Sequence, residues 1–437
     1  MGSRVGVVGA GYVGLTSAAC LAHLGHHVVC VDNDRAKLAD LRAAEVSIVE
    51  PGLPELVAQG LAENRLLFTA DPADLRDCEV VLLCLPTPPG ANGAADLGVL
   101  DTVLEALAGV LGPGCVLATK STVPVGTCAR IAHLPAFANT PVVSNPEFLR
   151  EGHAVEDFLH PDRIVVGAAD RHAEAAERVA ALYTETGAPV LHSDPASAEL
   201  AKYASNSFLA VKLSFVDTLA ELCERAGADI TKVTGAMAED DRIGPAFLAP
   251  GPGWGGSCLP KDTRALLRTA AAAGVDFAHV RDALRANDHQ HALVMRKIRR
   301  AVTGAPDGSL AGHRIGVLGL AFKAGTGDLR ESPALAIARR LAHHAATVTA
   351  YDPCVPPSDN PTITGHTGLR VVADPYRVAD NASALVILTE WPQFRSLDWP
   401  RLAAATARPV VVDTRNLLDE KLLAGTGFTL IGTGVPH

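Results

Sequence analysis

The sequence predicts an α/β protein in which two doubly wound parallel sheets are joined by a helical region. From the N-terminus to about residue 195, short apolar and β-branched runs alternate with alanine- and leucine-rich stretches, which is the pattern of βαβ units. The same alternation restarts after residue 308. Between these regions, residues 198–226 contain neither proline nor glycine and repeat their apolar residues at helical spacing, which predicts a long connecting helix.

Each element follows from a local pattern. In the first region we expect strands at 4–8, 27–31, 80–85, 116–120, 141–144, 163–167 and 189–191. Asp194-Pro195 and Gly227 are start and stop signals for the long helix, and 262–303 is again helical. Residues 304–308 are typical of a linker, and further strands are expected at 314–318, 347–351, 384–389 and 409–413. A chain of 437 residues is too long to fold around a single hydrophobic core. We therefore predict three domains, at residues 1–195, 196–303 and 309–437.

Composition narrows the class of protein and its partners. With 48% hydrophobic and 20% charged residues, the chain is typical of globular proteins. Its apolar runs are far shorter than the ~20 residues that span a bilayer, and a strand-like run starts at residue 4, so we expect neither a membrane segment nor a signal peptide. The nine cysteines are scattered and form no C-x-x-C pair. This usage predicts a protein of the reducing cytoplasm, without a metal site. A net charge of −10 argues against nucleic acid and anionic membranes as partners, although local cations can still hold anionic small molecules.

A glycine-rich turn predicts a dinucleotide site. Gly9, Gly11 and Gly14 stand in G-A-G-Y-V-G, directly after the first strand and before an alanine-rich helix. Such glycines permit a tight turn and a close approach of pyrophosphate to the helix N-terminus. The second strand ends in Asp32, where a carboxylate accepts hydrogen bonds from ribose hydroxyls and repels a 2′-phosphate. This favours a Rossmann-like domain that binds NAD rather than NADP, the alternative being a glycine turn used for packing alone. Lys37 is either a further cofactor contact or a solvated lysine.

The most informative stretch is G-W-G-G-S-C-L-P-K-D, which ends at Asp262. Cys258 lies beside a predicted helix start, with Lys261 one turn onward. A helix dipole and an ammonium group both lower a thiol pKa from about 8.5. We therefore interpret Cys258 as a nucleophile and the other eight cysteines as small buried hydrophobic residues.

Together with six other motifs, this stretch resembles the UDP-glucose/GDP-mannose dehydrogenase family. The resemblance covers the whole chain and includes G-A-G-Y-V-G at Gly9, K-S-T-V-P-V-G-T at Lys120, N-P-E-F-L-R-E-G at Asn145, A-K-Y-A-S-N at Ala201, R-I-G at Arg242 and G-L-A-F-K at Gly319. The family implies an N-terminal NAD-binding domain, a central helical domain that forms a homodimer, and a C-terminal Rossmann-like domain that binds UDP. It also implies a four-electron oxidation of a sugar C6 alcohol to a carboxylate by two NAD in succession.

The resemblance assigns roles in the oxidation steps. Lys202 and Asn206 lie four residues apart on one face of the predicted helix, so both can reach one oxygen. The family places both at the C6 oxygen, for its deprotonation and for stabilising its developing charge. Cys258 would then attack the aldehyde, and the second oxidation would leave a thioester on this residue.

Hydrolysis of the thioester needs a base and a positioned water. By resemblance Glu147 is that base, and Thr122 and Asp262 order the water and its neighbours. Glu151 lies one turn beyond Glu147 if the segment is helical, and it resembles a residue near the cofactor. The roles of the two glutamates stay open, and each has the alternative of an ordinary solvated carboxylate.

The same motifs suggest further ligand contacts. Expected cofactor contacts are Gly9, Gly11, Tyr12, Val13, Gly14, Asp32, Lys37, Thr87, Thr122, Glu151, Lys261 and Arg330. Expected substrate contacts are Glu147, Phe148, Leu149, Glu151, Lys202, Asn206, Arg242, Phe247, Leu248, Gly255, Lys323 and Arg415. In the family, Arg242 reaches into the site of the partner subunit. For each cation, an ordinary ion pair is the alternative.

Ser257 bears on the substrate, because members of the family that act on N-acetylated UDP-sugars typically carry histidine at this place. Together with the R-I-G segment, it favours UDP-glucose, with GDP-mannose as the second candidate. A non-catalytic sugar-nucleotide sensor is the alternative from another class. The presence of Cys258, Lys202 and Asn206 argues against a sensor.

Overall fold

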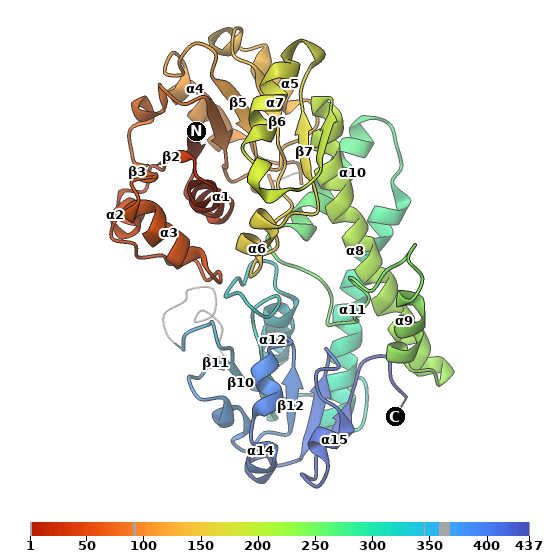
Figure 1. The fold of residues 1–437 in the computed structure, drawn as a ribbon. Helices are drawn as coiled ribbons and strands as arrows, with labels where there is room; N and C mark the ends of the chain where they lie inside the picture. Colours follow the sequence, from red (N-terminus) through yellow and green to blue (C-terminus); the bar gives the residue numbers. More distant parts are fainter. Residues whose placement is uncertain (1, 91–92, 345, 358–367, 437) are drawn as a thin grey trace. The chain divides into compact units, whose positions relative to one another are not determined.

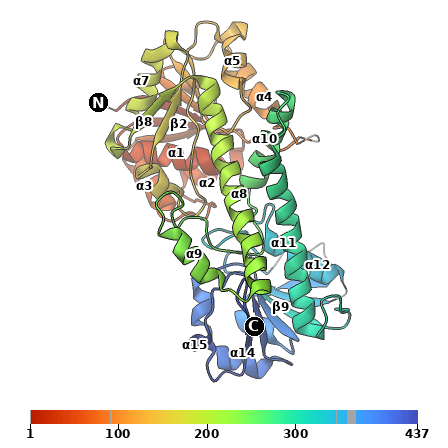
Figure 2. The same cartoon turned by 90° about the vertical axis from the view of Figure 1, so that its right-hand side faces the viewer.

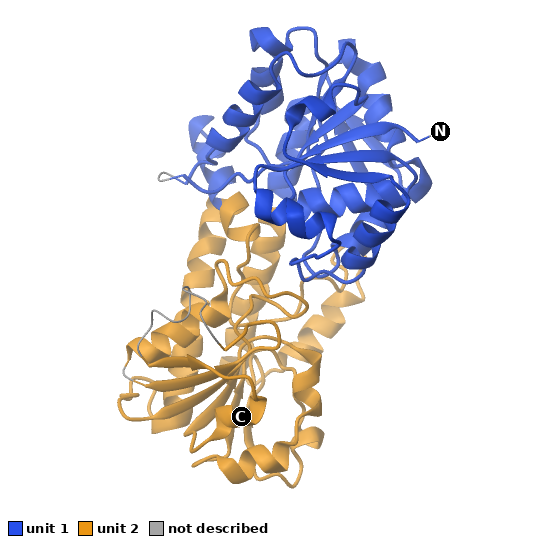
Figure 3. Cartoon of the chain, turned by 90° about the vertical axis from the view of Figure 1, so that its left-hand side faces the viewer, with its two compact units in different colours: residues 1–205, 264–275 blue, residues 206–263, 276–437 orange. Residues whose placement is uncertain are grey.

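The computed structural model describes residues 2–90, 93–344, 346–357 and 368–436. The chain divides into two units, residues 1–205 with 264–275 and residues 206–263 with 276–437 (Figure 3). Among the residues described, no helix combines the length and apolar character needed to cross a membrane.

The first unit is built on an eight-stranded sheet in the order β3-β2-β1-β4-β5-β6-β7-β8 (Figure 1). Its strands are β1 (Arg4–Val8), β2 (His27–Val31), β3 (Leu66–Thr69), β4 (Val80–Leu83), β5 (Val116–Thr119), β6 (Val142–Ser144), β7 (Ile164–Gly167) and β8 (Val190–Ser193). All neighbouring strands are parallel except β6 and β7. Central strands such as β4 are apolar and buried throughout, because helices cover both faces of a parallel sheet.

The helices of this unit form two buried layers. They are α1 (Tyr12–His23), α2 (Arg35–Arg42), α3 (Leu53–Ala62), α4 (Gly98–Leu107), α5 (Thr127–Ala132), α6 (Ala154–Leu159) and α7 (Ala173–Ala181), with 3₁₀ turns η1 (Pro72–Leu75), η2 (Pro135–Phe137), η3 (Asp170–His172) and η4 (Thr184–Thr186). Leu15, Phe158 and Val179, from α1, α6 and α7, belong to one hydrophobic cluster. Leu104 and Ile131, from α4 and α5, belong to the other.

The second unit contains a six-stranded parallel sheet in the order β11-β10-β9-β12-β13-β14. The strands are β9 (Arg314–Leu318), β10 (Thr347–Tyr351), β11 (Leu369–Val371), β12 (Ala384–Ile387), β13 (Val410–Asp413) and β14 (Thr429–Ile431). Helices α9 (Ile230–Ala238), α11 (Ala278–Thr303), α12 (Pro333–His343), α14 (Trp399–Ala405) and α15 (Glu420–Leu423) accompany it, with 3₁₀ turns η5 (Pro375–Ala379) and η6 (Pro392–Ser396). Side chains of α11 and α12 line one of its two cores, and Trp399 and Leu402 of α14 line the other.

Each of the two sheets has the same hydrogen-bonded turn after its first strand in the sequence, although the sequence shows no repeat. The amide of Gly9 donates to the last carbonyl of β2 at 2.7 Å, and that of Gly319 donates to the last carbonyl of β10 at 2.8 Å. Asp32 follows β2 and accepts from the amide after Gly9 at 2.7 Å. Asp352 follows β10 and accepts from the amide after Gly319, also at 2.7 Å. The first six strands of unit 1 and all six of unit 2 thus follow the strand order of the Rossmann fold.

The long helix α8 (Pro195–Ala226) starts three residues before the predicted 198–226 (Figure 2). Its first turn includes Pro195, and the Asp194 side chain accepts from the amide of Ser197 at 2.9 Å, as in an N-cap. Gly227 follows the helix with a φ of 73°. The helix α10 (Leu259–Ala272) lies between α9 and α11 in the sequence. The predicted fold class, two Rossmann-like α/β domains with a long helix between them, is confirmed.

Candidate active site

The glycine loop connects β1 to the N-terminus of α1. A Cβ on Gly14 would lie 1.8 Å from the carbonyl oxygen of Gly9, so a glycine is needed there for the helix to pack on the loop. A Cβ on Gly11 would meet no atom within 4 Å, so protein packing does not require this glycine. Tyr12 and Val13 form the first turn of α1, whose amides point out of the helix end. The loop therefore fits a pyrophosphate group that approaches the backbone closely.

Asp32 lies directly after β2, beside the glycine loop. Its carboxylate accepts from the amides of Ala10 and Asp34 and lies 3.1 Å from the Lys37 ammonium. Burial raises the pKa of Asp32, but these donors outweigh burial and hold it below its usual value. An ionised carboxylate here suits the ribose hydroxyls of NAD. Lys37, a predicted cofactor contact, is paired with Asp32 instead of standing alone in solvent.

Thr87 and Thr122 follow neighbouring strands, β4 and β5. The hydroxyl of Thr87 donates to the carbonyl of Thr122 at 2.8 Å, so the structure brings these two predicted residues together. Ser121 ties the same two strand ends by accepting from the amide of Leu85 at 2.6 Å. Since β4 is adjacent to β1, where the strand order reverses, both threonines belong to the edge at which open α/β sheets bind their ligands.

Glu147 and Lys202 form a buried ion pair. The Lys202 ammonium of α8 lies 2.9 Å from Oε1 of Glu147, and the two side chains are 4% and 6% exposed. Oε2 of Glu147 accepts from the amide of Leu149 at 2.6 Å. The ring of Phe148 lies beneath the Lys202 ammonium at 5.3 Å. Burial raises the pKa of Glu147, but Lys202 and the Leu149 amide outweigh it and keep the pKa below its usual value. Glu147 is thus an ionised carboxylate in a buried place.

Glu151 does not lie one helical turn beyond Glu147. The chain from Glu147 to Arg150 has no regular structure, a turn follows at Glu151 and Gly152, and α6 begins only at Ala154. Gly152 has a φ of 81°, a value that the sharp turn requires and that glycine adopts without strain. The segment is not helical, so the condition for a one-turn spacing of the two glutamates is not met.

Cys258 occupies the N-cap position of α10. Its carbonyl accepts the first helical hydrogen bond, from the amide of Asp262 at 2.9 Å, and its thiol is partly exposed. The hydroxyl of Ser257 lies 3.5 Å from Sγ of Cys258. The other cysteines are buried except Cys354, which is also partly exposed. The position of Cys258 at a helix N-terminus is the setting that favours a thiolate.

Asp262 links the thiol helix to α8. Its carboxylate is fully buried and accepts from the Asn206 amide at 2.6 Å and from the Lys261 ammonium at 2.6 Å. The positive charge of Lys261 is therefore shared with Asp262, not directed at Cys258 alone. Lys202 and Asn206, four residues apart in α8, thus have different acidic partners: Glu147 for the first and Asp262 for the second.

The glycines before Cys258 serve packing against the C-terminal part of unit 2. A Cβ on Gly255 would lie 1.9 Å from the carbonyl oxygen of Glu331, and one on Gly256 would lie 2.7 Å from the ring of Phe322. Phe247 has a φ of 61°, which is rare for a large side chain and frequent at ligand-binding loops. Leu248, beside it, is buried. The structure thus brings the loop with Gly255 onto the loop after β9.

Three predicted cations of unit 2 have different surroundings. Lys323 follows Phe322 in the loop after β9, and its ammonium lies 5.6 Å from the centre of that ring. Arg330 is exposed and forms an ion pair with Asp328 at 2.7 Å. Arg242 is 89% exposed and its guanidinium pairs with Asp240 at 2.6 Å. The exposure of Arg242 suits a residue that serves a partner subunit.

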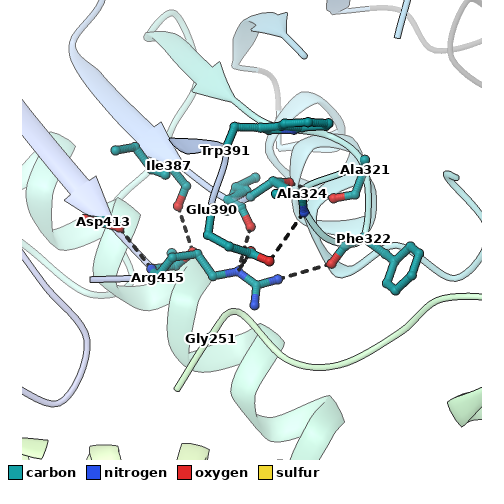
Figure 4. A network of polar contacts seen from close by, with 12 residues as sticks. Gly251, Ala321, Phe322, Ala324, Ile387, Glu390, Trp391, Asp413 and Arg415 are labelled. Carbon is teal, nitrogen blue, oxygen red and sulfur yellow. Dashed lines mark hydrogen bonds and ion pairs between the residues drawn. The ribbon is translucent and has the colours of Figure 1, made fainter. Parts of the chain in front are cut away.

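Arg415 joins three segments of unit 2 (Figure 4). Its guanidinium lies 3.1 Å from Glu390 and donates to the carbonyls of Leu388 at 3.1 Å and Phe322 at 3.3 Å. A Cβ on Gly251 would lie 2.8 Å from a terminal nitrogen of Arg415. Since these contacts engage Nε and one terminal nitrogen, the predicted substrate contact of Arg415 competes with an existing structural role.

Sequence reasoning missed three buried carboxylates that hold these loops. Glu50 accepts from the amides of Gly152 and Ala154, next to Glu151. Glu199, one turn before Lys202, accepts from the amides of Gly126 and Cys128, in the motif that contains Thr122. Asp217 accepts from the amide of Gly251 at 2.8 Å. The only available signal was an acidic residue in otherwise apolar or glycine-rich sequence, because each partner is distant in the chain.

Known proteins resemble this chain over nearly its whole length. Models of the UDP-glucose/GDP-mannose dehydrogenase family match the chain in three parts: the NAD binding domain at residues 3–186, the central domain at 196–289 and the UDP binding domain at 316–420. The UDP-glucose 6-dehydrogenase of Rhizobium meliloti is 41% identical over 99% of this chain and 100% of its own. That of Pseudomonas aeruginosa is 40% identical over 99% and 98%. The solved structure of a UDP-glucose dehydrogenase from Pyrobaculum islandicum has a TM-score of 0.87 and 34% identity, over 100% of this chain and 98% of that one.

The family assignment agrees with the geometry of the first unit. The family model for residues 3–186 describes an NAD binding domain, and the glycine loop and Asp32 of this chain fit that cofactor. The chain therefore belongs to the UDP-glucose/GDP-mannose dehydrogenase family and is an NAD-dependent dehydrogenase of nucleotide sugars.

Proposed function

We propose that the chain oxidises UDP-glucose at C6 to UDP-glucuronate, through a covalent intermediate on Cys258. Full-length similarity to UDP-glucose 6-dehydrogenases supports this substrate over GDP-mannose, and Ser257 argues against N-acetylated UDP-sugars. The observation that carries the covalent step is the place of Cys258 at the N-cap of α10, one turn before the buried Asp262.

The first oxidation removes a proton and a hydride from the C6 alcohol. NAD held by the glycine loop and Asp32 would supply the hydride acceptor for both oxidations. Lys202 and Asn206 are adjacent on one face of α8, so both can donate to the C6 oxygen. Lys202 relays the hydroxyl proton away from C6, and the Glu147 carboxylate 2.9 Å away balances the charge of the lysine.

The thiolate of Cys258 then bonds to C6 of the aldehyde, and the carbonyl oxygen takes up a proton from Lys202 to give a thiohemiacetal. Loss of a hydride from C6 and of the hydroxyl proton, which leaves through Lys202, gives a thioester. Water adds to this carbon while Glu147 takes its proton, and the C–S bond breaks to release the carboxylate and regenerate the thiol. Asn206 and Asp262, which are hydrogen-bonded to each other at 2.6 Å, orient the reacting oxygen and its neighbours.

The other thiols are poorly suited to this role. Burial raises the pKa of Cys78 to about 11 and that of Cys84 to about 12. The pKa values of Cys20, Cys30, Cys115, Cys128 and Cys354 are also raised, in each case mainly by burial. A thiol with a raised pKa stays protonated and does not attack an aldehyde. Cys223 is excluded by position instead, because it is only 3% exposed. These observations support Cys258 as the nucleophile.

The test combines a substrate panel with two variants. Wild-type enzyme should form NADH with UDP-glucose much faster than with GDP-mannose or N-acetylated UDP-sugars. Cys258→Ser should bind substrate and NAD normally while kcat falls by orders of magnitude. Glu147→Gln should accumulate a sugar-nucleotide adduct on Cys258, detectable by intact mass, after a burst of NADH. Full turnover by Cys258→Ala, or an adduct on another cysteine, would contradict the covalent mechanism.

We also propose that the chain forms a homodimer through α8. Phe208, Phe215 and Leu222 are 66%, 56% and 58% exposed and follow one another at seven-residue spacing. This spacing places them along one stripe of the helix, as in a coiled-coil seam. A second copy presents the same stripe and can cover it. Light scattering should give a dimer for wild type and a monomer for Phe208→Glu/Phe215→Glu, and a monomeric wild type would refute the proposal.

We also propose a separate function for each of the three domains. Residues 1–195 would bind NAD, 196–303 would contribute the dimer contact, and 309–437 would bind UDP. The three family-model matches fall within these limits, which supports the assignment. Protection of 309–437 from hydrogen exchange by UDP alone would test it, and protection confined to other residues would contradict it.

A further inference from the structure

Glu50 is a buried carboxylate that lies between α2 and α3, outside the predicted site. It is 4% exposed, in the segment E-P-G-L that leads into α3. Both of its oxygens accept from the backbone of one distant turn. Oε2 accepts from the amide of Gly152 at 2.7 Å, and Oε1 accepts from the amide of Ala154 at 2.7 Å. Glu50 therefore caps the N-terminus of α6 from another part of the unit.

Tyr12 extends this contact to the glycine loop. Its hydroxyl is hydrogen-bonded to Oε2 of Glu50 and also accepts from the amide of Gly152 at 2.8 Å. Burial and the hydrogen bond to Glu50 raise the pKa of Tyr12, so the phenol is neutral and donates to the carboxylate. Tyr12 is also the first residue of α1, directly after Gly11. Tyr12 thus connects the cofactor loop to the turn at Gly152 both directly and through the Glu50 carboxylate.

The same turn ends the segment that begins with Glu147. Lys202 holds one end of this segment through Glu147, and Glu50 holds the other through Gly152. Between them, Arg150 is fixed by its ion pair with Asp157 of α6. Any displacement of Tyr12 is therefore transmitted through Glu50 to a short segment whose other end carries the buried carboxylate.

We propose that Glu50 is a positioning residue that couples NAD binding at the glycine loop to the placement of the segment 147–152. A helix cap alone does not account for the arrangement, because capping α6 needs no hydroxyl from Tyr12. The proposal rests on the proposed function for the role of Glu147, but the coupling itself can be measured without turnover.

The experiment compares Glu50→Gln and Tyr12→Phe with Glu199→Gln. Glu199 is a matched control, because it is a buried carboxylate that accepts from two amides, Gly126 at 2.6 Å and Cys128 at 2.8 Å, at the start of the six-residue α5. Within the part of the chain that the structure describes, no hydrogen bond or ion pair joins Glu199 to the glycine loop. The readouts are NAD affinity by calorimetry and hydrogen exchange of residues 149–155 with and without NAD.

In the wild type, NAD should slow exchange in 149–155. In Glu50→Gln and Tyr12→Phe, this response should shrink and NAD affinity should fall by about ten-fold, the effect of one hydrogen bond to a charged group. KM for NAD should rise while KM for the nucleotide sugar stays within about two-fold. Glu199→Gln should lower thermal stability but keep the exchange response to NAD.

An unchanged response and unchanged NAD affinity in both Glu50→Gln and Tyr12→Phe would overturn the coupling and leave Glu50 as a helix cap. Should Glu50→Gln not fold, Tyr12→Phe removes one hydroxyl and decides the question alone. A failure of UDP-glucose as substrate would be seen in the panel of nucleotide sugars and would leave these binding and exchange results intact.

Discussion

The ammonium of Lys202 lies 2.9 Å from the carboxylate of Glu147, and neither side chain is appreciably exposed. Each group therefore sets the charge of the other. In the proposed reaction, Lys202 acts at the alcohol and Glu147 at the water that cleaves the thioester. One buried ion pair would thus serve both steps, because Glu147 balances the charge of Lys202 during the oxidations and stays ionised for the hydrolysis.

This ion pair leads to a prediction about stability. Lys202→Met leaves Glu147 buried without its counter-charge, which should cost roughly 3–5 kcal/mol. The double variant Lys202→Met/Glu147→Gln removes both charges and should be more stable than Lys202→Met alone. Thermal unfolding of the single and double variants measures this order. Additive losses would show that the two charges do not depend on each other.

Asp217 should make stability depend on pH in the opposite direction from an ordinary carboxylate. Burial raises its pKa to about 7, above the usual 3.8, and the Gly251 amide and the Arg415 charge offset burial only in part. Between pH 3.8 and about 7, the folded state keeps this proton while the unfolded chain has lost it. The contribution of Asp217 to the free energy of unfolding is therefore fully present below pH 3.8 and is lost as pH rises towards 7.

The stability of Asp217→Asn relative to wild type should therefore increase as pH rises. The asparagine oxygen can still accept from the amide of Gly251 but carries no charge to bury. We expect the melting temperature of the variant relative to wild type to be higher at about pH 8 than at about pH 5. An equal difference at both pH values would mean that Asp217 is ionised throughout.

Cofactor choice should depend on Asp32. Its carboxylate is ionised and would repel a 2′-phosphate while accepting from both ribose hydroxyls of NAD. Asp32→Ala should lower kcat/KM with NAD by roughly 10- to 100-fold, the range for losing hydrogen bonds to a charged group, and narrow the preference over NADP. The adjacent Lys37 would then favour the extra phosphate. Comparable kcat/KM with both cofactors in the wild type would contradict this role of Asp32.

Arg242 should act in the site of a second subunit. It is exposed and paired only with its neighbour Asp240 among the residues described. Arg242→Ala and Cys258→Ala should each be inactive, but mixing them should restore part of the activity, because a hybrid dimer contains one intact site. The control is a mixture of Cys258→Ala with Cys258→Ser, which has no intact site. No recovery after proven subunit exchange would argue against a shared site.

The sequence by itself determined the central strands and the long helix. β1, β2, β9 and β10 have the predicted bounds, because strands buried on both faces are continuous apolar runs with clear ends. The strands that sequence reasoning missed, β3, β11 and β14, lie at sheet edges. β3 has only four residues, and exposed polar residues, Arg370 and Thr429, interrupt the apolar pattern of β11 and β14. Local pattern therefore identifies a strand most clearly where the strand is buried along its length.

The partners of the charged groups were decided only by the tertiary structure. Motif spacing pointed to Lys202, Asn206, Glu147 and Asp262. It did not indicate that Lys202 pairs with Glu147 and that Asn206 pairs with Asp262. Glu50 stands 102 residues before Gly152 in the chain, so no local pattern could connect them. A buried charge needs donors from whichever segment packs against it, and packing brings together segments that are remote in sequence.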